Sequence, residues 1–166
     1  MSAARENLCY KEGVPIEPTS IVSWTDDWAW GLPMIVLTVA IHSFGLRLVD
    51  WRVTLLLGGD ANRRRPWYAS GAIIYGTVLF ASILHGIEAA IWSGAYVLLG
   101  ALPNREAAML YSLSAMTSYG HAEVYLPLHW QLMGSLESLN GWILFGLTTA
   151  FLFSVMRKVW PSFDRF

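Results

Sequence analysis

Three long apolar runs, separated by short polar segments, constrain the fold of this chain more than any other feature. The runs cover residues 28–49, 68–102 and 130–159. A helix of about 20 apolar residues crosses a bilayer, so each run is long enough to span. The chain is 55% hydrophobic and only 14% charged, which is too little polar surface for a soluble domain. The sequence therefore predicts an all-α membrane protein with three transmembrane helices.

The polar segments outline the predicted organisation. Residues 1–27 are polar and interrupted by prolines, which predicts an extracytoplasmic N-terminal arm. An additional N-terminal transmembrane helix is expected over residues 28–57, where 53–57 either continue the helix obliquely or turn along the interface. Turn-forming residues 58–62 then lead directly into three arginines and a proline.

Basic residues set the predicted orientation. Lys and Arg beside a span resist translocation, so the loop at residues 63–65 and the end at Arg157-Lys158 should both be cytoplasmic. These two basic sites agree with each other under a three-span model, which is an independent check on it. The N-terminus and residues 103–129 are then outside, and the C-terminus is cytoplasmic.

A segment too short to span lies between the second and third runs. Residues 105–117 are moderately apolar, and residues 118–129 are rich in turn formers and polar groups. A span, a short helix, an irregular stretch and another span form the arrangement of a re-entrant pore loop, in which protein or water must cover the irregular backbone. The alternative is an outer loop with an amphipathic surface helix, and topology alone leaves both open.

This short segment also carries a motif. Residues 112–123 read Ser-Leu-Ser-Ala-Met-Thr-Ser-Tyr-Gly-His-Ala-Glu and align without a gap to the potassium-channel pattern S-x-x-T-x-T-T-V-G-Y-G-D. Thr117 and Ser118 match the paired threonines. Gly120 matches the first glycine, and Glu123 matches the aspartate. The segment therefore resembles the selectivity filter of the bacterial pore-loop potassium channel family.

Two other stretches carry the same resemblance. Residues 141–150 are similar to the inner helix of simple two-helix potassium channels, where a hinge glycine is followed by F-G-L-x-T-A. The pattern His85-x-x-Glu88-x-x-x-Trp92 resembles the outer helix of bacterial members of the superfamily. The resemblance implies a tetrameric pore-loop channel fold with a pore module at residues 68–159. Its parts are an outer helix 68–102, a pore helix 105–117, a filter 118–123 and an inner helix 130–159.

The implied function is passive transport of a cation, with no cofactor. Potassium would be held by backbone carbonyls of the filter and by the Ser118 hydroxyl, and sodium is the second candidate permeant ion. The implied partners are further copies of the chain, forming a homotetramer, and membrane lipids. A net charge of −1 argues against nucleic acid, and no soluble substrate is evident. The implied location is the inner (plasma) membrane of a bacterium.

Three filter positions depart from the family pattern. Tyr119 replaces a valine, His121 replaces the tyrosine and Ala122 replaces the second glycine. Alanine in a left-handed conformation costs roughly 1–2 kcal/mol, so non-standard geometry is expected in the outer half and weakened selectivity with it. We expect the His121 ring to pack behind the filter, and the alternative is a ring of four titrating histidines at the mouth.

An aromatic stripe is predicted on the third span. Its members recur at spacings of three and four, and they are Trp142, Phe145, Thr149 and Phe153. By the family resemblance this stripe lines the cavity after a hinge at Gly141 and forms a hydrophobic gate. Ordinary helix packing would give the same spacing.

His85 and Glu88 lie three residues apart and share one helix face. Ionisable groups in the middle of a membrane usually face the protein interior and pair. We expect this structural polar pair to tie the outer helix to the pore helix, and the alternative is a proton or ion relay.

Two rival functions remain open from the sequence. One is a channel-fold protein that does not conduct and serves as an assembly or sensing partner, and the other is a small transporter subunit or membrane enzyme. The four histidines contain no i, i+4 pair on one helix, and the chain has no Gly-x-Ser-x-Gly elbow or phosphate loop. We therefore expect that the protein is not an enzyme.

The predicted topology can be tested at Cys9, the only cysteine. An impermeant thiol reagent added to intact cells should label Cys9, because the N-terminus is predicted to lie outside. Labelling that requires the cytoplasmic face to be opened first would contradict this orientation.

Overall fold

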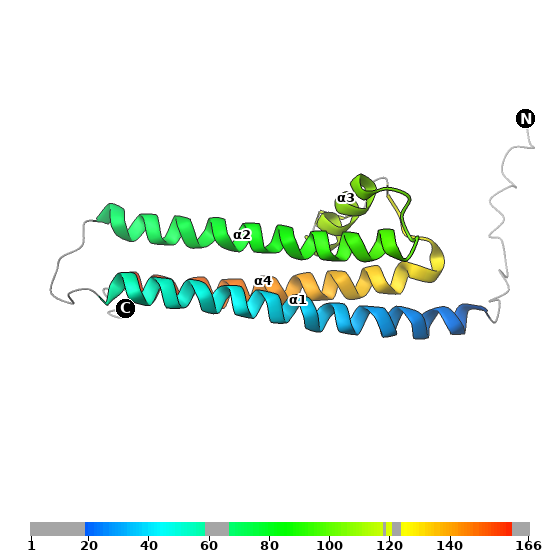
Figure 1. The fold of residues 1–166 in the computed structure, drawn as a ribbon, viewed down its shortest axis with the longest axis horizontal. Coiled ribbons are helices and arrows are strands. Elements are labelled where there is room, and N and C mark those ends of the chain that lie inside the picture. The colour runs from blue at the N-terminus through cyan, green and yellow to red at the C-terminus, as the bar shows by residue number, and fades with distance from the viewer. Residues whose placement is uncertain (1–18, 59–66, 118, 121–123, 161–166) are drawn as a thin grey trace, which may run out of the picture.

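Three long helices lie side by side in the computed structural model, which describes residues 19–58, 67–117, 119–120 and 124–160 (Figure 1). They are α1 (Thr19–Leu57), α2 (Trp67–Leu98) and α4 (Gln131–Val159), and every regular element in the described ranges is helical. Each contains a stretch long and apolar enough to cross a membrane. The chain thus has the helices of a multi-pass membrane protein, as the sequence predicts.

The two remaining helices are short and lie at one end of the bundle. The helix α3 (Arg105–Met116) packs on α2 and α4, and the 3-10 helix η1 (Leu128–Trp130) precedes α4. Along the bundle, α1 and α4 run in the same direction and α2 runs in the opposite one (Figure 1). The larger apolar core lies at the α3 end and buries Tyr96, Tyr111 and Met133. Valines of α1 and α4 form a smaller core at the other end.

The first helix begins earlier than the apolar run predicts. It starts at Thr19, so the predicted arm at residues 1–27 overlaps α1, and residues 53–57 simply continue the helix. Asp27 is only 1% exposed despite its charge. Hydropathy assigns such a residue to a loop, whereas packing against neighbouring helices can enclose it within a helix.

The second helix ends earlier than predicted. It stops at Leu98 rather than at residue 102, because Gly100 adopts φ +67°, a conformation that glycine reaches without steric cost. The Ala101 N–H then donates to the Tyr96 carbonyl at 2.9 Å, which satisfies an acceptor at the helix end. Asn104 caps α3 by accepting a hydrogen bond from the Ala107 N–H at 2.7 Å. The other predicted helix limits agree with the structure to within about a residue, the usual uncertainty of helix ends.

The short helix α3 runs along α4 toward the middle of that helix. Successive residues of α3 meet residues progressively further along α4, in the pairs Tyr111 with Gly134, Ser112 with Glu137, and Met116 with Gly141. A helix rises about 1.5 Å per residue, so Gly141 lies about 15 Å beyond the start of α4. The C-terminal end of α3 therefore lies about 15 Å along α4 from the end where α4 begins.

The contact at Gly141 predicts a specific packing defect. A Cβ at this position would lie 2.5 Å from the Met116 carbonyl oxygen and 2.8 Å from its Cα. Because backbone cannot move aside cheaply, Gly141→Ala should lower the free energy of unfolding by about 1–3 kcal/mol. The matched control is Gly146→Ala on the same helix, where a Cβ meets no heavy atom within 4 Å. Thermal unfolding in detergent measures both, and equal midpoints for the two variants would contradict the close packing of α3 on α4.

Candidate functional site

In the described ranges, two clusters of polar side chains lie between the helices, in addition to a buried hydrogen bond from Asn140 to Thr38. Hydrocarbon offers no hydrogen-bond partner, so such groups must be satisfied within the protein. The first, here called the histidine cluster, consists of His42, His85, Glu88 and Thr148. The second, here called the Glu137 network, consists of Tyr96, Ser112 and Glu137.

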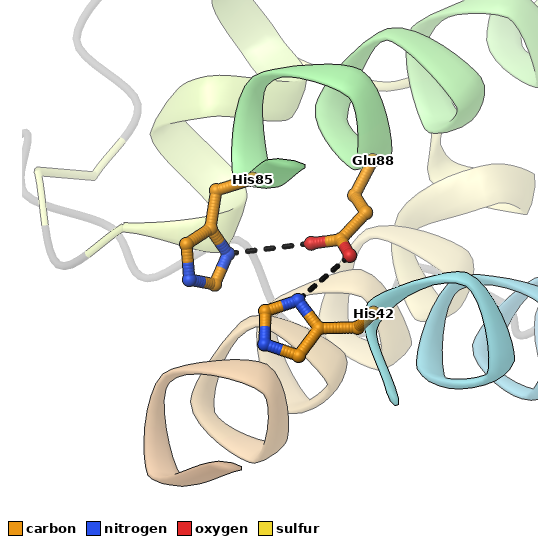
Figure 2. Close-up of side chains that lie close together, drawn as sticks. All are labelled: His42, His85 and Glu88. Carbon is orange, nitrogen blue, oxygen red and sulfur yellow. Dashed lines mark hydrogen bonds and ion pairs between the residues drawn. The ribbon is translucent and has the colours of Figure 1, made fainter. Parts of the chain in front are cut away.

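In the histidine cluster, two imidazole rings point toward one carboxylate (Figure 2). His42 comes from α1, and His85 and Glu88 come from α2. His42 Nδ1 lies 2.8 Å from Glu88 Oε1, and His85 Nδ1 lies 3.3 Å from Glu88 Oε2. The side chains of His42 and Glu88 are fully buried, and that of His85 is 25% exposed.

Thr148 of α4 closes the cluster on its other side. Its Oγ1 lies 2.9 Å from His42 Nε2 and 3.1 Å from His85 Nε2. Each ring therefore extends from the Glu88 carboxylate to the Thr148 hydroxyl, and the two ring centroids are 4.9 Å apart. The cluster joins all three long helices at one point.

These partners differ from the expected ones. We expected His85 and Glu88 to tie the outer helix to the pore helix, whereas their contacts described here reach α1 and α4. The contribution of His42 does not follow from the sequence pattern, because His42 lies on a different helix from His85 and shares no i, i+4 spacing with it. The available signal was depth: His42 and the His85–Glu88 pair all lie well inside their apolar runs, and charged groups at one depth tend to pair.

The Glu137 network makes the link to α3. The Tyr96 hydroxyl donates to Glu137 Oε2 at 2.7 Å, and the Ser112 hydroxyl donates to Oε1. One buried carboxylate thus joins α2, α3 and α4. Tyr111 packs edge-on against Tyr96, with centroids 5.3 Å apart, and burial beside the Glu137 carboxylate raises the pKa of the Tyr111 phenol. That phenol therefore remains neutral.

The structure describes part of the predicted filter, immediately after α3. The Thr117 hydroxyl donates to the Leu113 carbonyl at 2.7 Å and thereby extends the end of the helix. Tyr119 is 82% exposed, and Gly120 is exposed with φ +81°. Four predicted filter residues lie outside the described ranges: Ser118, His121, Ala122 and Glu123.

The predicted pore-lining residues divide into two groups. The aromatic stripe is exposed along α4, namely at Trp142, Phe145, Thr149 and Phe153. In contrast, Gly141 is buried against the Met116 backbone, so its observed contact is with α3. The stripe is therefore an apolar face that this single chain leaves uncovered.

Comparison of the chain with protein-family models, with curated proteins and with solved structures finds no match.

Removal of one donor from the Glu137 network gives a direct test of its importance. Tyr96→Phe should lower the free energy of unfolding by about 1–3 kcal/mol, because it leaves a buried carboxylate oxygen without its donor. Tyr75→Phe on the same helix is the control, since Tyr75 is 76% exposed. Unfolding by denaturing detergent in mixed micelles, followed by tryptophan fluorescence, compares them. If the two variants unfold alike, the network does not hold α3 in place.

Proposed function

We propose that the chain is the subunit of a homotetrameric, potassium-type cation channel with a weakened selectivity filter. In this proposal α2, α3, the segment 117–123 and α4 form the pore module, and α1 is an additional helix. The protein lies in a bacterial inner membrane with its N-terminus outside.

The course of α3 carries this proposal. It begins at the end of the bundle where α4 also begins, and it ends beside Gly141, about 15 Å along α4. The chain then returns, because Leu126 is buried in the apolar core at the α3 end. A short helix that enters a bilayer and returns on the same side has the course of a pore loop.

Exposure of the returning loop supports an oligomer. Tyr119 and Gly120 are exposed in the single chain, although irregular backbone inside a bilayer requires cover from protein or water. Further copies around a water-filled axis supply both. The exposed aromatic stripe on α4, which includes Trp142 and Phe145, offers apolar surface for contacts between these copies or with lipid.

Electrostatics at the end of α3 favour a cation. The C-terminal end of a helix carries a partial charge of about −0.5, and four such ends would converge on the axis. The positive φ of Gly120 allows its neighbouring carbonyls to turn in a way that other residues resist. Rings of carbonyl oxygens replace the hydration shell of a permeant ion.

Restoration of the family filter tests the proposed function. Tyr119→Val, His121→Tyr and Ala122→Gly together should raise the potassium-to-sodium flux ratio of reconstituted protein above that of the native chain. The reason is that glycine relieves roughly 1–2 kcal/mol of strain per subunit. If the triple variant assembles like the native protein but passes no ions, the channel proposal is wrong. Strong potassium selectivity in the native protein would instead show that alanine fits the filter.

Gly120→Ala in the native chain, measured by the same flux assay, provides a second test. Among the described residues of the single chain, a Cβ there meets no heavy atom within 4 Å, so Gly120→Ala adds backbone strain without a clash inside the subunit. Flux should therefore fall several-fold while the thermal midpoint stays within a few degrees. Gly94→Ala on α2 also meets open space, without a positive φ, and serves as the control. Unchanged flux in Gly120→Ala would argue that this loop lies outside the conduction path.

A further inference from the structure

The histidine cluster brings two imidazole nitrogens and one buried carboxylate close enough together to share a cation. Each Glu88 oxygen faces an imidazole Nδ1, with a hydrogen bond from His42 but only a 3.3 Å contact to His85. If both rings are neutral with hydrogen on Nδ1, both Nε2 atoms are acceptors. The Thr148 hydroxyl lies within hydrogen-bond distance of both but has one hydrogen to donate. One Nε2 then lacks a donor. If hydrogen instead lies on His85 Nε2, two unprotonated acceptors face each other, namely His85 Nδ1 and Glu88 Oε2. An additional proton or a metal ion relieves either arrangement.

Three observations favour a metal ion. The ligand atoms of His42, His85 and Glu88 all lie within 4.8 Å of one another, although they come from two helices. Glu88 Oε2 is fully buried, makes no hydrogen bond and lies 3.3 Å from His85 Nδ1, so an ion bound between these two atoms would satisfy both. Both rings also point toward the carboxylate rather than away from it (Figure 2). We infer that His42, His85 and Glu88 bind a divalent transition-metal ion of the zinc class.

The donor set selects the class of ion. Two imidazoles and one carboxylate are a recognised zinc ligand set, with a fourth position left for water. Calcium, magnesium and potassium prefer oxygen ligands, so the permeant ion of the proposed channel does not fit here.

Thr148 completes the arrangement as a positioning residue. With a metal ion on the Nδ1 side, each ring carries hydrogen on Nε2 and donates it to the Thr148 oxygen, which has two lone pairs. Such outer hydrogen bonds fix the tautomer and orientation of ligating histidines. The partial exposure of His85 leaves one side of the cluster open for the ion to enter.

A bound metal ion would hold α1 against the other two long helices. Because His42 is the ligand from α1, the ion would tie the additional helix to α2 and, through Thr148, to α4. Metal binding to the folded state alone stabilises it by mass action. This inference does not depend on conduction, since a chain that passes no ions could still bind the metal.

Cobalt titration of the full-length, untagged protein tests the site. After chelator treatment in detergent, Co²⁺ should bind at one ion per chain with the visible absorption of a four-coordinate site. Zn²⁺ should displace it, and excess Mg²⁺ or K⁺ should not. Glu88→Gln keeps the shape of the side chain but removes its charge, and it should weaken Co²⁺ binding at least tenfold. His129→Gln, at an exposed histidine outside the cluster, should bind like the native chain.

Thr148→Val tests the site by a second substitution, so the test still holds if Glu88→Gln fails to fold. Loss of its hydroxyl should weaken Co²⁺ binding about 10- to 100-fold, as is typical when a ligand loses its supporting hydrogen bond. Native protein that is folded and monodisperse yet binds no Co²⁺ would overturn the inference in favour of a shared proton. So would equal binding by the native, Glu88→Gln and Thr148→Val proteins.

Discussion

The buried carboxylate of Glu137 is the interaction on which the placement of α3 depends. It accepts hydrogen bonds from Tyr96 of α2 and Ser112 of α3, and no solvent could replace these donors in hydrocarbon. Further along α4, the absence of a side chain at Gly141 lets the Met116 backbone approach this helix directly. These two features hold a short helix at a fixed depth beside two spanning helices. In the proposed channel, the loop that follows lies within the bilayer, and further copies would cover its backbone.

The additional helix α1 is held by a different set of contacts. Gly31 and Gly45 allow leucines of α4 and α2 to pack closely on it, as small residues commonly do between membrane helices. Asn140 of α4 donates to Thr38 at 2.8 Å, and His42 joins the histidine cluster. Polar contacts thus connect α1 to both helices of the proposed pore module. A change at the histidine cluster would therefore affect α1 and the proposed pore module together.

Much of the fold could be predicted from the sequence, because helix length and hydropathy are local properties. Three long helices and the short helix at residues 105–116 follow from apolar runs and turn formers. The early start of α1 could not be predicted from the sequence, since packing rather than hydropathy encloses Asp27. The partners of Glu88 could not be predicted either. Its place in the middle of an apolar run indicates a buried acid, but which helix supplies each donor depends on the three-dimensional arrangement. The filter motif predicts a site whose outer residues lie outside the described ranges, and its tetrameric geometry stays a prediction.

A single-particle reconstruction of the purified full-length protein in a lipid nanodisc tests the central claim most directly. The proposed function predicts four copies around one axis, with residues 118–122 of each copy lining that axis and ion density between them. It also predicts that the exposed face of α4 at Trp142 and Phe145 lies toward the axis or a neighbouring copy. A monomer or dimer, or an assembly whose residues 118–122 lie away from the symmetry axis, would contradict the channel proposal.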